Sequence, residues 1–161
     1  MNNQNDSYQL LGSRLNMLSA NSGYRTSIDP VLLAASIPVK TGQRILDVGC
    51  GTGAAALCLA TRIPGTIAMG IDCQAPLIVL ANQISSLNGL TSSAKFITCD
   101  LLGPIAYPQP HSFDHVMANP PHLKFGSGNV SPDPLKAAAN MEGTAKLKDW
   151  GLFCFESVVN G

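Results

Sequence analysis

The stretch Arg44-Ile45-Leu46-Asp47-Val48-Gly49-Cys50-Gly51-Thr52-Gly53 decides the fold of this chain. Its first half is apolar enough for a buried strand. The three glycines that follow allow a sharp turn and a close approach of the backbone to a ligand. A helical pattern begins at residue 54, so the free N–H groups at the start of a helix point toward the same place. A strand, a glycine turn and a helix in this order predict a ligand site at the turn.

Two ligand classes suit this turn. Gly49, Gly51 and Ala54 satisfy the dinucleotide pattern G-x-G-x-x-[GA]. Asp47, however, stands two residues before the first glycine. A carboxylate there is a poor neighbour for a pyrophosphate and a good partner for an ammonium group or a sugar hydroxyl. We therefore place the dinucleotide interpretation second, and a glycine turn without any ligand third.

Two further carboxylates, Asp72 and Asp100, close apolar strands in the same way. Because the carboxyl ends of parallel strands meet at one edge of an open α/β sheet, we expect both beside Asp47, where such sheets bind ligands. Asp72 is placed to hold ribose hydroxyls and Asp100 to accept from an adenine amino group. Each of them alone could also be a helix N-cap, an alternative that is strongest for Asp72.

A fourth apolar run, 113–118, ends in Asn119-Pro120-Pro121-His122. The side-chain carbonyl of Asn119 and the backbone carbonyl of Pro120 can each accept one N–H of a planar amino group. The first proline keeps Asn119 extended, and the proline rings fix the turn that follows. The ring of His122 could stack on a flat substrate. The alternative is a strand that simply stops at a Pro-Pro turn.

These motifs together resemble those of the class I S-adenosylmethionine-dependent methyltransferases. Asp47–Gly53 is similar to their first cofactor motif, and Asn119–His122 is similar to the NPP[YFHW] motif of enzymes that methylate exocyclic or amide nitrogens. Within that family the chain resembles most the bacterial tRNA(Val) adenine exocyclic-amine methyltransferases, through 23–35, 113–121 and 131–134. The departure is at His122, where that subgroup usually has tyrosine.

The resemblance implies a cofactor, S-adenosylmethionine, whose methionine part lies at the glycine turn. The residues that it assigns to the cofactor are Asp47, Gly49, Cys50, Gly51, Gly53, Asp72, Cys73, Asp100, Leu101 and Asn119. Those that it assigns to catalysis are Asn119, Pro120, Pro121 and His122. Arg25 and Lys124 are expected to contact the RNA substrate.

The implied function is methylation of an exocyclic amino group of adenine in tRNA. Two alternatives stay open, one because the formal net charge is zero whereas nucleic-acid binders usually carry a basic face, and one because the chain is short for the family. One is methylation of a glutamine side-chain amide in a protein. The other is a folded methyltransferase remnant without activity.

Composition predicts an α/β protein of one domain over residues 1–161, with a flexible tail at 1–9. Only 12% of the residues are charged, as expected where parallel strands are buried on both faces. No apolar stretch reaches the length of a membrane span and no secretory signal is visible. Five cysteines without a C-x-x-C pair predict reduced thiols on apolar segments and a cytoplasmic location. No His and Cys spacing suits zinc, so no metal is expected.

The predicted order is that of a doubly wound parallel sheet of the Rossmann-like methyltransferase type. The strands are expected at 44–49, 66–72, 94–99 and 113–118, and the helices at 29–36, 53–62, 75–88 and 147–159. The family's sheet has seven strands, so we expect a fold that is incomplete at its C-terminus. The strand at 113–118 would then be an open edge through which two copies could pair.

Overall fold

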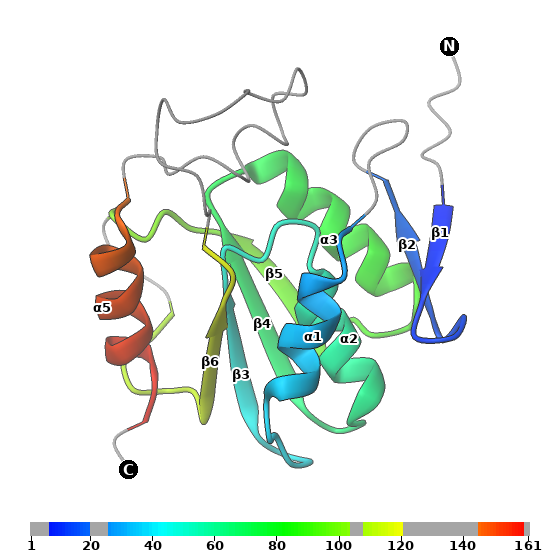
Figure 1. Ribbon diagram of the computed structural model, residues 1–161, viewed down its shortest axis with the longest axis horizontal. Helices are drawn as coiled ribbons and strands as arrows, with labels where there is room; N and C mark the ends of the chain where they lie inside the picture. Colours follow the sequence, from blue (N-terminus) through cyan, green and yellow to red (C-terminus); the bar gives the residue numbers. More distant parts are fainter. Residues whose placement is uncertain (1–6, 20–25, 104–107, 121–144, 160–161) are drawn as a thin grey trace.

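A four-stranded parallel sheet forms the centre of the molecule (Figure 1). The computed structural model describes residues 7–19, 26–103, 108–120 and 145–159. The strands, in chain order, are β3 (Arg44–Val48), β4 (Ile67–Asp72), β5 (Ala94–Thr98) and β6 (His115–Ala118). Their order across the sheet is β5-β4-β3-β6. The chain therefore builds outward from β3 in one direction and then returns to add β6 on its other side.

Alternate residues of β3 belong to two separate apolar clusters, one on each face of the sheet. Ile45 is buried in the first cluster, whereas Leu46 and Val48 are buried in the second. This arrangement follows from the period of two along a strand. It explains why the strand reads as a nearly continuous apolar run, as expected for a parallel strand that is covered on both faces.

Helices cover both faces of the sheet. The helix α1 (Asp29–Ser36) packs on α2 (Ala54–Arg62), and α2 and α3 (Ala75–Leu87) pack on the strands through the first cluster. The helix α5 (Leu147–Ser157) packs on β6 and β3, where its Phe153 belongs to the second cluster. The predicted doubly wound α/β fold is confirmed, and the predicted ends of these elements are within two residues of the observed ones.

The N-terminal segment corrects the prediction of a flexible tail over 1–9. Residues Ser7–Leu10 form β1, which pairs antiparallel with β2 (Leu15–Leu18). Leu15 and Met17 of β2 are fully buried. The apolar residues that alternate along this hairpin therefore dock it against the first cluster, and residues 1–6 of the predicted tail lie outside the described residues.

The region around β6 differs from the prediction at both of its boundaries. Phe113 lies before the regular strand and forms a parallel bridge with Val158, just after α5. The Val159 N–H donates to the Phe113 carbonyl at 2.9 Å. The predicted last helix therefore ends two residues early, because Val158 and Val159 are extended alongside the start of β6. Along His115–Ala118 the described residues place β3 on one side of β6 and no strand on the other, as predicted for an edge.

Candidate active site

The reversal of strand order between β3 and β6 marks the place where open α/β sheets bind ligands, outside the carboxyl ends of the strands. Val48 of β3 is paired with Ala118 of β6. The residues that follow them, Gly49 and Asn119, therefore leave the sheet side by side. The glycine turn and the asparagine motif, which are far apart in the sequence, meet at this reversal point.

The glycine turn has one crowded side and one open side. Gly49 has φ +69, and a side chain there would collide with the ring of Trp150, whose Cζ3 would be 2.7 Å from the added Cβ. Gly51 has φ +55, and a Cβ there would meet nothing within 4 Å. Gly53, also at positive φ, precedes the first residue of α2. The backbone at Gly51 is thus open to a ligand, whereas Gly49 is covered by an aromatic ring.

Asp47 does not face the ligand edge as the sequence alone suggested. It is 2% exposed, and its Oδ2 accepts the N–H of Ala56 in α2 at 3.2 Å. Burial raises the pKa of its carboxyl to about 7, the Ala56 N–H opposes this rise, and the charge of Asp72 adds to it. Asp47 therefore joins β3 to the first turn of α2 beneath the glycine turn.

Asp72 ties the glycine turn to the turn after β4. Its Oδ2 accepts the Gly51 N–H and its Oδ1 accepts the Gln74 N–H, both at 2.9 Å. A carboxylate has about four acceptor sites, so each oxygen can still accept a hydroxyl hydrogen. The N-cap alternative considered for Asp72 is wrong, because the N-cap residue of α3 is Gln74 and Asp72 only accepts the N–H of that residue.

Asp100 lies exposed beyond the end of β5. Its Oδ1 accepts the N–H of Leu102 at 3.0 Å, and its backbone carbonyl accepts the N–H of Gly103 at 2.9 Å. Leu101, next to it, packs partly buried against the second cluster. The carboxylate therefore shapes its own turn and keeps one oxygen toward solvent.

Two thiols border the carboxylates of the site. Cys50 is buried, and burial together with the charges of Asp47 and Asp72 holds the pKa of its thiol well above the usual range. Cys73 is exposed, and its pKa is also raised, chiefly by desolvation and then by Asp72. Both remain thiols at neutral pH, so neither is a good nucleophile. The expectation that the cysteines lie on buried segments holds for Cys50 and Cys58 and fails for Cys73.

Only part of the asparagine motif can be located. Asn119 is exposed and Pro120 is half-buried, directly after β6. Four of the predicted site residues lie outside the described residues: Arg25, Pro121, His122 and Lys124.

Trp150 was not predicted to belong to the site. It lies in the first turn of α5, half-buried against the second cluster, and its ring covers Gly49. The signal that could have singled it out is that it is the one tryptophan of the chain. Its position over the glycine turn depends on how α5 packs, which no local pattern reveals.

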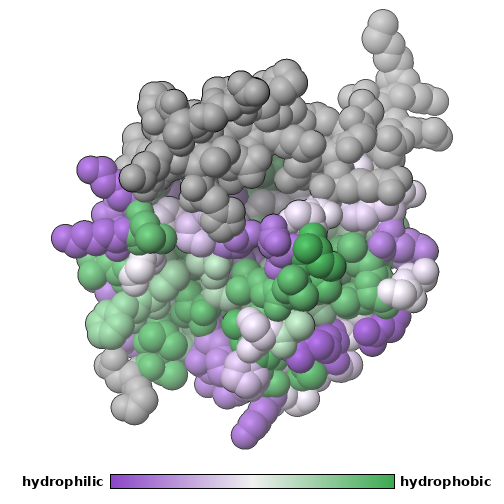
Figure 2. Space-filling model, in the orientation of Figure 1, coloured by the Kyte–Doolittle hydropathy of each residue, from purple (hydrophilic) through white to green (hydrophobic). Residues whose placement is uncertain are grey.

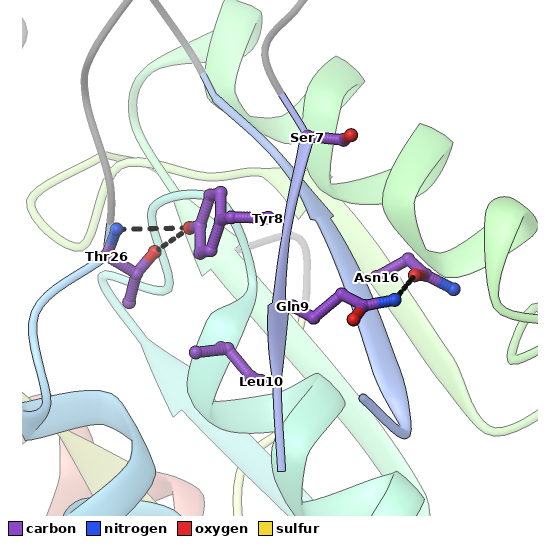
Figure 3. Close-up of a pocket in the computed structure, with 6 residues that line it drawn as sticks. All are labelled: Ser7, Tyr8, Gln9, Leu10, Asn16 and Thr26. Carbon is purple, nitrogen blue, oxygen red and sulfur yellow. Dashed lines mark hydrogen bonds between the residues drawn. The ribbon is translucent and has the colours of Figure 1, made fainter. Parts of the chain in front are cut away.

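A pocket of about 580 Å³ lies elsewhere, at the N-terminal hairpin (Figure 3). It is lined by Ser7, Tyr8, Gln9, Leu10, Asn16 and Thr26. Its polar groups are paired with one another: the Tyr8 hydroxyl donates to Thr26 Oγ1 at 2.6 Å, and Gln9 Nε2 donates to Asn16 Oδ1 at 3.0 Å. None of the described residues that line this pocket is a predicted site residue, so the reversal point of the sheet remains the candidate site.

The part of the chain that the structure describes contains no group of three His, Cys, Asp or Glu residues arranged to hold a metal ion. None of its helices has the length and apolar character needed to cross a membrane.

A comparison with known families matches residues 24–141 to the methyltransferase small domain. The chain belongs to this family. Its matched region begins before α1, includes the glycine turn and continues past Asn119.

Two curated relatives of this methyltransferase domain carry the same name. A tRNA1(Val) (adenine(37)-N6)-methyltransferase from Vibrio campbellii is 29% identical over 86% of this chain and 56% of its own length. One from Yersinia pestis is 34% identical over 84% of this chain and 53% of its own length. The chain thus spans about half the length of the curated relatives it matches. Among solved structures, YjhP from E. coli superposes with a TM-score of 0.56 at 19% identity, over 83% of this chain and 45% of that one, which supports the fold.

Proposed function

We propose that this methyltransferase domain transfers a methyl group from S-adenosylmethionine to the exocyclic amino group of an adenine in tRNA. One observation carries the proposal: the pairing of Val48 with Ala118 brings the glycine turn and Asn119 together at the reversal point of the sheet. A donor site and an acceptor for an amino group are thereby adjacent, as a transfer between them requires.

The residues of the site suit S-adenosylmethionine. Gly51 exposes bare backbone to open space, which admits the methionine part of the cofactor. Asp72, at the end of β4, retains acceptor capacity for ribose hydroxyls, and Asp100, at the end of β5, has an oxygen left for the adenine side. We assign Asp47 a different role from the other carboxylates, because it is buried beneath the turn and holds α2 rather than the ligand.

The chain's own contribution to the reaction is to hold and aim the target nitrogen. The Asn119 side-chain carbonyl accepts one N–H of the amino group, and the Pro120 backbone carbonyl accepts the other. These two bonds draw the nitrogen lone pair out of conjugation with the base and toward the glycine turn. S-adenosylmethionine, when bound, supplies an electrophilic methyl group on a positively charged sulfur. Positioning and preorganised polar groups supply most of the rate. No general base is needed, because methylation acidifies the nitrogen, whose extra proton then leaves to water.

The choice of tRNA follows the names of the two relatives. The chain's charge neither requires nor forbids it, since the formal net charge is zero. Lys146 and Lys148 are exposed at the start of α5, near the Trp150 end of the site. Together with Arg25 and Lys124 they are the residues we propose to contact phosphates. A base in RNA must leave its stack to reach Asn119.

The test is transfer of a labelled methyl group from S-adenosylmethionine to total tRNA, compared with total protein from the same cells. We expect label in tRNA as N6-methyladenine. Label on a glutamine amide in protein would favour the alternative substrate. Cofactor binding without any transfer would identify the chain as an inactive methyltransferase remnant.

The variant Asn119→Ala tests the mechanism. It should lose transfer by on the order of 100-fold or more, since the missing carbonyl acts on the reacting nitrogen. It should keep its affinity for the cofactor in calorimetry. Substantial turnover by this variant would remove Asn119 from the mechanism.

We further propose that residues 1–161 form one domain, that it works in the cytoplasm, and that two copies pair at the β6 edge. The support for pairing is the open side of His115–Ala118 together with a hydrophobic surface on α5. Figure 2 shows that surface in green on the left, and its exposed members on α5 are Leu147, Leu152 and Phe155. An open strand edge beside exposed apolar side chains favours association.

A further inference from the structure

Asparagine side chains from α3 close two of the outer strand edges of this chain. At β5, Asn82 accepts the Phe96 N–H at 3.2 Å and donates to the Phe96 carbonyl at 2.9 Å. At β2, Asn88 bonds in the same way to the N–H and carbonyl of Asn16, at 2.8 and 2.7 Å. Each amide takes the place of a neighbouring strand and so protects the edge from pairing with another chain. Within the described residues, the outer edges of β1 and β6 have no neighbouring strand.

The bonds of Asn16 also show which way the backbone of β1 faces. Gln9 of β1 lies directly opposite Asn16, and such a pair in antiparallel strands exchanges either both backbone hydrogen bonds or none. Because the Asn16 N–H and carbonyl bond to Asn88, the Gln9 N–H and carbonyl point away from β2. The same holds for Ser7, two residues earlier in the strand. The described part of the chain provides no bond for these outward backbone groups.

The pocket of about 580 Å³ at the hairpin follows this outward edge. All four residues of β1 line it, although successive side chains of a strand point to opposite faces. Figure 3 shows this alternation, with Tyr8 and Gln9 on opposite sides of the strand. A pocket that contacts both faces of one strand lies along its edge. None of the residues that line it is charged, and β1 contains neither lysine nor proline, which protect many other edges.

An extended peptide is the ligand that fits this edge. Its N–H and C=O groups recur on one side at every second residue, as do those of Ser7 and Gln9, so the two backbones can form a ladder. Tyr8 and Leu10 offer apolar contact on one face of that ladder. The lining favours an uncharged segment, because a charged side chain would lose water without gaining an opposite charge among the lining residues.

We propose that the outer edge of β1 binds an extended, uncharged peptide strand of a partner protein, which becomes the third strand of the N-terminal sheet. A second copy of this chain is the less suitable occupant. Copies are proposed to pair at the β6 edge, and a second self-pairing edge would let them add to one another without closing. The proposal does not rest on methyl transfer, because this edge contains none of the residues proposed for it.

A synthetic peptide tests the edge directly. The probe is a capped peptide of alternating threonine and valine, which are uncharged and favour strands. Added to the isotope-labelled chain, it should shift the amide resonances of Ser7 and Gln9 with saturation and slow hydrogen exchange at the Gln9 amide. The same peptide methylated at every amide nitrogen cannot donate to the Ser7 and Gln9 carbonyls. It should bind more weakly by roughly 2- to 12-fold for each lost bond.

Two substitutions at one position separate the backbone from the side chain. Gln9→Pro removes the outward N–H but no bond to β2, a position at which an edge strand tolerates proline. It should weaken binding of the unmethylated peptide by roughly 2- to 12-fold or more. Gln9→Ala is the matched control, because it also lacks the side-chain bond to Asn16 but keeps the backbone N–H. It should bind the peptide as the wild type does, and circular dichroism checks that both variants are folded.

Four results would overturn the proposal. The first is a peptide at millimolar concentration that leaves the Ser7 and Gln9 resonances in place, and the second is equal binding of the methylated peptide. The third is equal binding by Gln9→Pro and Gln9→Ala; if the proline variant does not fold, the methylated peptide decides alone. The fourth is self-association in sedimentation that Gln9→Ala keeps and Gln9→Pro loses, which would assign the edge to a second copy of the chain.

Discussion

At the scale of single residues, the site depends on which side of β3 each residue faces. Asp47 shares a face with Ile45, toward α2, so its carboxylate is buried and bonded to Ala56. Val48 faces the opposite cluster, and the chain turns at Gly49 immediately afterwards. Asp47 and Gly49, only two residues apart, therefore have unrelated tasks: one holds a helix, and the other leaves room for an aromatic ring.

The raised pKa of Asp47 makes stability depend on pH in a defined direction. The folded-state pKa of about 7 exceeds the usual value of 3.8, so the contribution of this carboxyl to stability is complete below about pH 4 and is lost as pH rises through 7. Because Asp47→Asn removes the titrating carboxyl, the unfolding free energy of this variant relative to the wild type should rise by on the order of 2 kcal/mol between pH 5 and pH 8. Urea unfolding at both pH values measures this difference. A constant difference would mean that Asp47 ionises normally in the folded chain.

Alanine substitutions at two glycines of the same turn distinguish the cost of backbone strain from the cost of a steric clash. Both Gly49→Ala and Gly51→Ala pay for a positive φ, about 1–2 kcal/mol each, but only the first places a Cβ against Trp150. Gly49→Ala should therefore lose at least about 1 kcal/mol more unfolding free energy than Gly51→Ala. Thermal or urea unfolding of the pair gives the comparison. Equal losses would show that the ring of Trp150 moves aside at no cost.

At the scale of elements, one side chain at the end of α3 holds the N-terminal hairpin in register. Asn88 Oδ1 accepts the Asn16 N–H at 2.8 Å, and Asn88 Nδ2 donates to the Asn16 carbonyl at 2.7 Å. The same amide nitrogen also lies 2.8 Å from the Ile84 carbonyl. The Asn88 amide thus bonds to both backbone polar groups of Asn16, as the backbone of a neighbouring strand would. These bonds join residues 72 positions apart.

Asn88→Ala should loosen the hairpin more than it harms the sheet. Two backbone groups of Asn16 exchange their partner for water, because both bonds are exposed, which costs roughly 0.5–1.5 kcal/mol of unfolding free energy. Hydrogen exchange at the Asn16 amide should accelerate strongly, while exchange in β3 and β4 should follow only the global loss of stability.

The matched control for the hairpin is Gln9→Ala. Its side chain also bonds to Asn16, but through a single bond of 3.0 Å to the Asn16 side chain rather than to its backbone groups. It should change neither stability nor exchange appreciably. Unaltered protection of Asn16 in Asn88→Ala would mean that burial of Leu15 and Met17 holds the hairpin without this amide.

At the scale of the whole molecule, the two edges of the sheet differ. The β5 side is accompanied by α3, which packs closely on that strand. On the β6 side, the described residues add a backbone bridge at the start of the edge alone, where Phe113 meets Val158. Beyond it the described part of β6 is an edge, and the outer face of α5 next to it is apolar.

If two copies pair at this edge, a charge on α5 should separate them. Phe155→Lys, at a side chain that is 69% exposed, should shift a dimer toward monomer in sedimentation without unfolding the chain. Val79→Lys is the control, since Val79 is 58% exposed on α3, which packs on the other face of the sheet. A wild-type chain that stays monomeric at high concentration would contradict pairing.

The sequence by itself determined the parallel sheet, the helices between its strands and the glycine turn. These follow from signals that lie within a few residues of one another: apolar runs, helical periodicity, and glycines such as Gly51 whose positive φ other residues rarely adopt. The same local logic placed Asp72, Asp100 and Asn119 at strand ends, because parallel strands bring their carboxyl ends to one edge.

Only the tertiary structure decided how residues distant in the chain meet. The docking of the β1–β2 hairpin on α3, the bridge from Phe113 to Val158 and the ring of Trp150 over Gly49 each depend on packing between distant segments. The burial of Asp47 depends on α2 lying across β3. Local sequence propensity cannot predict such contacts. Their free energy comes from the burial of apolar area and from hydrogen bonds that form only when the layers of the fold have assembled.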